Sequence, residues 1–469
     1  MRKYILFCAL LFGVPELNAQ MKAFGIWEGK MNAGVELRII FRIYKDELNR
    51  VVATMDSPDQ GIKDVKASSV KIENDSVYLE LSQYNAKYSG KIIGDTIMIG
   101  TFEHGTSLPL TFRKIQSVTV KKRPQTPIPP FPYIAEDLIY YNADKSISYG
   151  ATITIPNGKG PFPAVLLLTG SGQQNRDEEI MGHKPFAVIA DYLTRNGFVV
   201  LRVDDRGMGK TTGDVLSATT LDFARDAATS IEYLKNRNEV NQSRIGLIGH
   251  SEGGMIAQIL GAERNDLSFI IMLAGPGENN IKLMEDQNKA ILTKAGMSEE
   301  YINSYLSLYR KFLTTILTSD QSSVLNNLTK VVDDWMAVTP NNIVKATTGI
   351  SDETTKMRFI NQFRNQVDRP WFRYFLSYDP AINLKKIRAK ILALNGASDI
   401  QVISKGNLAA IEQALIQGRS AGYEIKELPG LNHLFQDCKS CTVAEYGQLE
   451  QTISPVVLKI ITEWMKAVK

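Results

Sequence analysis

Apolar and polar residues alternate with a period of two in the first part of the chain, between about residues 25 and 114. One side of such a run is formed by Val35, Leu37, Ile39, Phe41 and Ile43. This alternation is typical of antiparallel strands that bury one face. Turn residues recur at short intervals between the runs, so residues 20–115 are expected to form a small β-rich domain, either a sandwich or a barrel.

A proline-rich segment follows over residues 116–135. Its prolines are Pro124, Pro127, Pro129, Pro130 and Pro132. Proline at this density keeps a chain extended and stiff, which predicts a linker. The basic triplet at residues 121–123 could belong to a nucleic-acid patch, but nothing aromatic or glycine-rich accompanies it. A solvated linker is the better interpretation.

Beyond about residue 136 the pattern changes to continuous apolar runs that alternate with helical patterns. The runs lie at residues 164–168, 198–203, 244–248, 269–273 and 391–394. They are too apolar for a sheet with one wet face, and buried parallel strands covered by helices on both faces fit them. Residues 136–469 are therefore expected to form an α/β domain around a mostly parallel, doubly wound sheet.

The alternation stops over residues 276–378, where amphipathic helical patterns take its place. Loops of an α/β sheet that follow the strands lie over their carboxyl ends, where ligands bind. An insertion there is expected to act as a cap that shapes a substrate pocket. An independent helical domain without a role in binding is the alternative.

Composition excludes some classes of function. The chain has 469 residues, 44% of them hydrophobic and 22% charged, as in soluble globular proteins of more than one domain. Its formal net charge of +4 is small for this length and favours neither nucleic acid nor an acidic membrane as partner.

Residues 1–19 have the pattern of a cleavable signal peptide. Arg2 and Lys3 precede a short apolar run, Pro15 interrupts it, and residues 17–19 (Leu-Asn-Ala) follow before Gln20. The run is far shorter than the ~20 residues that span a bilayer as a helix. We therefore expect a periplasmic or secreted protein.

Two of the three cysteines, Cys438 and Cys441, would remain after cleavage. An oxidising compartment favours a local disulfide between them. Free thiols, a catalytic redox pair and a metal site are the alternatives. A zinc site would need further cysteine or histidine ligands, and the four histidines of the chain do not cluster nearby.

The sequence around Ser251 has the pattern of a nucleophile elbow. Gly249 and Gly253 lie two residues before and after this serine, an apolar run precedes it and a helical pattern follows. A side chain at either glycine would obstruct the sharp turn that exposes the serine hydroxyl. The pattern predicts Ser251 as a nucleophile.

A serine hydroxyl needs a base to remove its proton, and the base needs an acid to orient it. His433 is the only histidine after the elbow, in a loop that follows the strand-like run at residues 423–428. Asp399 follows the run at residues 391–394, at the same edge of the expected sheet. Asp379 is a weaker candidate for the acid, and Asp437 is expected to cap or to meet solvent.

The oxyanion formed by attack on a carbonyl requires two preorganised backbone donors. The amide of Glu252, which follows the nucleophile, is expected to be one. The other is expected in the glycine-rich loop 169–172, where we favour the amide of Ser171 over that of Gly172. This loop lacks the lysine and the spacing of a phosphate-binding P-loop.

These motifs resemble secreted bacterial α/β-hydrolases of the esterase D (EstD) type, a group related to dienelactone hydrolases and to prolyl oligopeptidases and serine aminopeptidases. The matching stretches are residues 168–172, 176–177, 204–207, 249–253, 371–375, 394–399 and 431–436. The chain order Ser251, Asp399, His433 is also that of α/β-hydrolases. The β-rich domain and the linker are similar to those of this group, whereas the cysteine pair is not part of its pattern.

The resemblance implies a carboxylesterase that acts on short acyl esters without metal or organic cofactor. Two alternatives remain. A peptidase of the prolyl oligopeptidase or serine aminopeptidase kind would need a buried acidic anchor for a substrate amine, for which Glu278 and Glu285 are candidates. A non-catalytic protein that binds glycan or cell-wall material is disfavoured by the intact set of catalytic residues. Acyl-chain length and oligomeric state do not follow from the sequence.

Overall fold

The computed structural model describes residues 21–32, 36–60, 62–104, 106–119, 121–367 and 369–468. The expected signal peptide, residues 1–19, lies outside the described residues. The chain divides into two compact units, of which the first runs as far as Lys122 and the second comprises Arg123–Glu179 and His183–Lys469. None of the described helices combines the length and apolar character that a membrane crossing requires.

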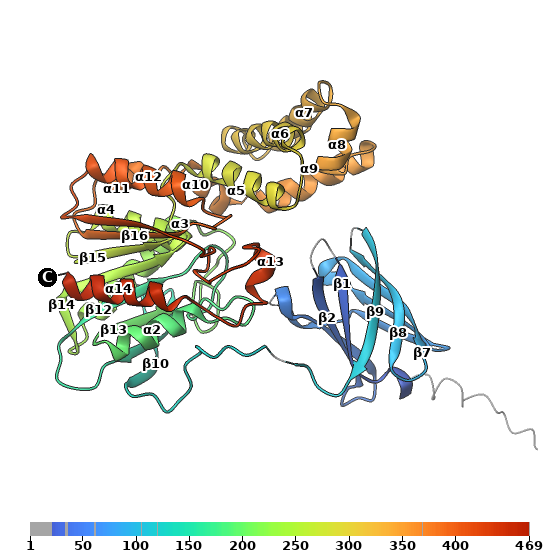
Figure 1. Cartoon of the computed structure of the whole chain (residues 1–469), viewed down its shortest axis with the longest axis horizontal. Coiled ribbons are helices and arrows are strands. Elements are labelled where there is room, and N and C mark those ends of the chain that lie inside the picture. The colour runs from blue at the N-terminus through green and yellow to red at the C-terminus, as the bar shows by residue number, and fades with distance from the viewer. Residues whose placement is uncertain are drawn as a thin grey trace, which may run out of the picture. The chain divides into compact units, whose positions relative to one another are not determined.

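The first unit is built on one curled, antiparallel sheet of nine strands (Figure 1). The strands are β1 (Gly25–Asn32), β2 (Glu36–Lys45), β3 (Val51–Ser57), β4 (Ile62–Lys66), β5 (Ser69–Glu73), β6 (Ser76–Leu81), β7 (Ala86–Ile93), β8 (Ile97–His104) and β9 (Thr106–Ile115), with short 3-10 helices at Pro58–Gln60 and Ser82–Tyr84. Their order is β4-β3-β2-β1-β9-β8-β7-β6-β5. The alternating residues of β2 face a core in which Phe41 stacks on Phe112, with ring centroids 4.6 Å apart.

The second unit contains a mixed sheet of eight strands in the order β10-β11-β13-β12-β14-β15-β16-β17. The strands are β10 (Ile134–Tyr141), β11 (Ser148–Ile155), β12 (Phe162–Leu168), β13 (Val199–Val203), β14 (Val240–His250), β15 (Phe269–Leu273), β16 (Lys390–Gly396) and β17 (Tyr423–Leu428). The strands from β12 to β17 run parallel, and β10 and β11 are antiparallel additions at one edge. The predicted mostly parallel α/β sheet is confirmed.

Helices cover both faces of this sheet (Figure 1). On one face lie α2 (Pro185–Arg195) and α14 (Pro455–Ala467), and on the other lie α3 (Thr220–Lys235), α4 (Glu252–Glu263), α11 (Pro380–Leu384) and α12 (Ser404–Ile416). Successive strand residues point to opposite faces. In β12, Val165 and Leu167 therefore pack with α2 and α14, while Leu166 and Leu168 pack with α3 and α4.

A helical insertion connects β15 to α11. Its helices are α5 (Asn280–Lys294), α6 (Glu299–Thr318), α7 (Val324–Met336), α8 (Asn341–Thr348), α9 (Glu353–Val367) and α10 (Pro370–Ser377). The buried residues of these helices, such as Phe312 and Phe372, belong to the same hydrophobic cluster as Met255 of α4. The insertion thus shares a core with the sheet rather than forming one of its own.

Candidate active site

Ser251 occupies a sharp turn between β14 and α4. Its backbone has φ 54° and ψ −118°, a conformation that a non-glycine residue seldom adopts. A Cβ atom on Gly249 would lie 2.0 Å from the carbonyl oxygen of Gly253, and one on Gly253 would lie 2.1 Å from that of Leu168. Both contacts are impossible, so glycine is required at both positions. The turn lies at the carboxyl ends of the parallel strands.

The structure brings His433 and Asp399 together at this same edge. Asp399 follows β16 and His433 follows β17, and the imidazole Nδ1 lies 2.7 Å from Asp399 Oδ2 with both side chains buried. The other carboxylate oxygen, Oδ1, accepts hydrogen bonds from the amides of Gln401 (2.7 Å) and Val402 (3.0 Å). The acid is therefore fixed by backbone donors, and Nε2 is the ring nitrogen left to exchange a proton.

The other two aspartates considered from the sequence lie elsewhere. Asp379 is exposed and accepts a hydrogen bond from the amide of Ala381 (3.0 Å) at the start of α11. Asp437 is exposed and accepts from Gln451 Nε2 (2.7 Å). Neither bonds to His433 among the described residues, so Asp399 alone has the position of an orienting acid.

His250, the last residue of β14, lies next to Ser251 in the chain and packs against His433. The rings of His250 and His433 have centroids 4.8 Å apart. The amide of Ser251 donates to the carbonyl of Leu273 (2.8 Å), which holds the turn against β15. Within the described residues the Ser251 hydroxyl makes no hydrogen bond. Catalytic hydrogen bonds often form only when substrate closes the site.

In the loop after β12, one backbone amide is already hydrogen-bonded to a side chain. The amide of Gly170 donates to Glu178 Oε1 at 2.7 Å. The next residue, Ser171, is exposed, and Gly172 has φ 97°, which favours glycine. The amide of Glu252 is the first of α4 and has no partner within its helix. The amide of Gly170 is therefore not free to bind an oxyanion, while those of Ser171 and Glu252, the two donors expected from the sequence, have no hydrogen-bond partner among the described residues.

The side chain of Glu252 is buried and connects this loop to the helical insertion. Its Oε1 accepts from Thr220 Oγ1 and from Trp371 Nε1, each at 2.7 Å. Burial raises the pKa of Glu252, and hydrogen bonds with Thr220, Trp371 and Ser171 oppose that rise. Trp371 belongs to α10, so the insertion is bonded to the residue that follows the nucleophile.

Asp205, which lies just after β13, supports the same loop. Its carboxyl accepts from Thr169 Oγ1 at 2.6 Å and from the amide of Gln174 at 2.8 Å. Burial raises the pKa of Asp205 to about 8, against the lowering effect of these two hydrogen bonds. The loop after β12 is therefore anchored by the carboxyl groups of Glu178 and Asp205.

Sequence reasoning missed the contacts of His250. Its Nδ1 lies 2.9 Å from Glu178 Oε1, and its Nε2 lies 3.0 Å from the carbonyl oxygen of His433. The place of His250 in the elbow was a signal that it lies near the nucleophile. Nothing in the sequence marked Glu178, which lies in an irregular loop before α2.

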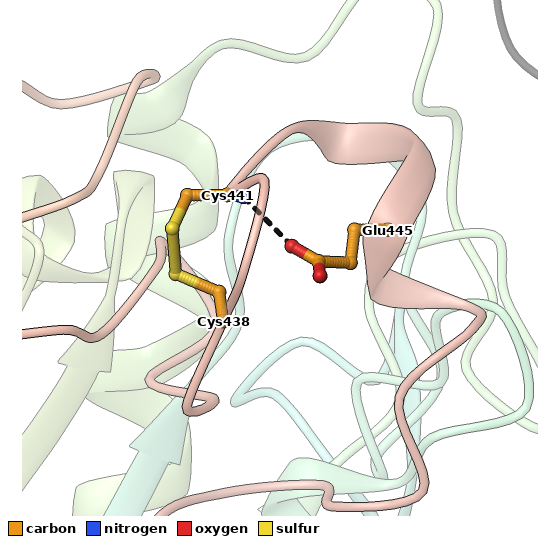
Figure 2. Close-up of side chains that lie close together, drawn as sticks. All are labelled: Cys438, Cys441 and Glu445. Atoms are coloured by element: carbon orange, nitrogen blue, oxygen red, sulfur yellow. Dashed lines mark hydrogen bonds between the residues drawn. A yellow bond between two sulfur atoms is a disulfide. The ribbon is translucent and has the colours of Figure 1, made fainter.

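A disulfide and a buried carboxylate hold the segment that follows His433 along the chain (Figure 2). Cys438 and Cys441 form the disulfide, and Glu445 accepts hydrogen bonds from the amides of Cys441 (2.7 Å) and Lys439 (3.0 Å). Burial raises the pKa of Glu445, but the hydrogen bonds from these amides outweigh burial, so the pKa is lowered. These three residues are the one His/Cys/Asp/Glu group with metal-site spacing in the described ranges. Thiolates bind metal, and sulfurs joined in a disulfide are not thiolates.

Replacement of both Cys438 and Cys441 by serine is expected to lower the free energy of unfolding by about 2 kcal/mol, the chain-entropy value for so short a loop. Urea unfolding of the wild type and the double variant measures the difference. Addition of a reductant should destabilise the wild type by the same amount and leave the variant unchanged. Equal stability of the two proteins under oxidising conditions would contradict a stabilising disulfide.

Parts of the chain are similar to known proteins. The family model described as serine aminopeptidase, S33 (Hydrolase_4) matches residues 183–348. Esterase EstD of Thermotoga maritima is 37% identical over 161 residues, which are 34% of this chain and 38% of that protein. An acyl transferase of Photobacterium leiognathi is 38% identical over 91 residues, which are 19% of this chain and 28% of that protein. The chain thus spans well under half the length of these relatives.

Among solved structures, the esterase Pf2001 of Pyrococcus furiosus has a TM-score of 0.42 and 13% sequence identity. The similarity covers 74% of this chain and 98% of that one.

Proposed function

We propose that this chain, an α/β-hydrolase, is a serine carboxylesterase that acts on short acyl esters. The observation that carries the proposal is the arrangement at one edge of the sheet. Ser251 lies in a glycine-flanked turn after β14, Asp399 lies in the loop after β16, and His433, which is bonded to Asp399, lies in the loop after β17. Nucleophile, base and orienting acid on neighbouring strand ends are what acyl transfer to water requires.

In the proposed reaction, Ser251 Oγ attacks the ester carbonyl while His433 Nε2 takes its proton. The amides of Glu252 and Ser171 donate to the oxyanion, and Asp399 holds the charged imidazole. The imidazolium then gives its proton to the leaving alcohol, and an acyl-enzyme on Ser251 remains. Water, deprotonated by His433, attacks this ester, and the imidazolium returns the proton to Ser251 Oγ as the acid is released. No metal or cofactor takes part in these steps.

A serine aminopeptidase is the second candidate, because the matching family model carries that description. Such an enzyme needs a carboxylate for the substrate amine. Glu285 is engaged in a two-bonded ion pair with Arg310 of α6. Glu278 remains: it is half-buried, its Oε2 has no hydrogen-bond partner among the described residues, and burial raises its pKa.

Assays with short-chain p-nitrophenyl esters and with aminoacyl p-nitroanilides separate the two candidates. We expect a much higher kcat/KM for the esters, and a fluorophosphonate probe that modifies Ser251, identified by peptide mass spectrometry. The Glu278→Gln variant is the matched control, because it should leave ester hydrolysis unchanged. Hydrolysis of the anilides that is lost in Glu278→Gln would instead assign the peptidase.

We also propose that the protein is exported. Two features support this: the signal-peptide pattern of residues 1–19 and the disulfide between Cys438 and Cys441, a bond typical of oxidising compartments.

A further inference from the structure

His250 lies between two loops that contribute to the candidate site. Its Nε2 bonds to the carbonyl oxygen of His433 at 3.0 Å, and its Nδ1 bonds to Glu178 Oε1 at 2.9 Å. The same oxygen of Glu178 accepts the amide of Gly170 at 2.7 Å. A continuous chain of hydrogen bonds therefore runs from the base loop, through the elbow, to the oxyanion loop.

Both ring nitrogens of His250 face oxygen acceptors. A carbonyl oxygen only accepts, so Nε2 must carry a proton. An ionised Glu178 also only accepts, so opposite a carboxylate Nδ1 carries a proton too, and His250 is then an imidazolium paired with that carboxylate. Burial alone would lower the pKa of His250, but the charge and hydrogen bond of Glu178, the carbonyl of His433 and the charge of Asp399 together raise it.

The backbone supports the importance of this contact. Glu178 has φ 51° and Phe435, two residues after His433, has φ 58°. Non-glycine residues seldom adopt this left-handed conformation, and such residues cluster at functional sites where the surrounding structure holds them. The loops are thus strained at the places where they meet the chain of bonds through His250.

We propose that His250 and Glu178 form a buried ion pair that positions the oxyanion loop and the base loop on either side of Ser251. The expected effect on kcat rests on the proposed function, whereas the ion pair itself does not depend on it. His250 is a positioning residue: it touches neither substrate nor the hydroxyl of Ser251, and it acts through the backbone of His433 and Gly170. Loss of the pair would let both loops drift by a fraction of an ångström, which lowers kcat more than it raises KM.

The ion pair is tested without any substrate. In ¹⁵N-labelled wild type we expect both ring nitrogens of His250 to carry protons at pH 7, and the four histidines are assigned by single variants. The titratable groups around His250 are Glu178, His433 and Asp399. In Glu178→Gln the amide oxygen keeps the bond from Gly170 but the charge is gone, so His250 should lose its second proton at a lower pH. A neutral His250 in the wild type at pH 7 would overturn the proposal, whether or not the protein hydrolyses esters.

The positioning role is tested by kinetics. We expect His250→Gln and Glu178→Gln to lower kcat for a short-chain aryl ester by roughly 10- to 100-fold, with KM within a factor of about two. Tyr140→Phe is the control, since it removes a buried hydrogen bond (2.6 Å) between the edge strand β10 and Ser230 of α3. It should lower the melting temperature without changing kcat. If His250→Gln does not fold, Glu178→Gln decides. Wild-type kcat in folded Glu178→Gln would overturn the positioning role.

Discussion

Replacement of Ser251 by alanine is expected to lower kcat for short-chain aryl esters by about 10⁴- to 10⁶-fold, the range found when a catalytic serine is removed. The residual rate would come from substrate binding and from the amide donors of Glu252 and Ser171. The alanine side chain fits wherever the serine fits, so the fold should be kept. Initial rates with p-nitrophenyl acetate and butyrate, together with the melting temperature, check both parts.

Ser243→Ala is the matched control for this variant. Ser243 lies in the same strand, β14, but at its exposed end, where its hydroxyl donates to Asn241 Oδ1 (2.8 Å). The control should retain wild-type activity. Substantial hydrolysis by Ser251→Ala would mean that another residue attacks the ester, and the mechanism proposed for Ser251 would have to be abandoned.

Apolar patterning located the parallel core of the second unit well. The run at residues 164–168 lies within β12, and the run at residues 269–273 coincides with β15. Strands that are buried on both faces must be apolar throughout, so their pattern is plain in the sequence. β10 and β11 were not among these runs. β10 is an edge strand in which only Tyr140 is fully buried, and partial exposure leaves no continuous apolar run.

The chemistry of the site was predictable where a residue type is rare or its spacing is constrained. The two glycines around Ser251 and the single histidine after the elbow pointed to Ser251 as the candidate nucleophile and His433 as the candidate base. The carboxyl groups that anchor the oxyanion loop were not predictable. Glu178 and Asp205 are two among 50 acidic residues, and only the fold shows which of these are buried against a loop amide.

The helical insertion was expected to shape a pocket. The structure shows in addition that the insertion is hydrogen-bonded to the residue after Ser251. Trp371 of α10 donates to Glu252, whose amide is one of the two proposed oxyanion donors. The side chain of Glu252 is also bonded to Thr220 of α3. Movement of α10 would therefore act on a residue adjacent to the nucleophile, and the insertion and the oxyanion site are expected to respond together to bound substrate.

Replacement of Asp399 by asparagine is expected to lower kcat by about 10⁴-fold with little change in KM. Two amides, of Gln401 and Val402, donate to Oδ1, so the asparagine oxygen stays with them and its NH₂ group replaces Oδ2. This NH₂ group then donates to His433 Nδ1, which must accept. The ring proton moves to Nε2, and His433 can no longer take the proton of Ser251. The pH dependence of kcat and KM in both proteins measures the effect.

Asp379→Asn is the control for this change of tautomer. Asp379 caps α11 through one hydrogen bond to the amide of Ala381, a role that asparagine fills equally well. Its activity and stability should match those of the wild type. If Asp379→Asn loses activity and Asp399→Asn stays within tenfold of the wild type, the orienting acid is Asp379, and the bond of 2.7 Å between His433 and Asp399 is structural only. Because both variants exchange one oxygen for an NH₂ group, any difference between them arises from position and not from lost charge alone.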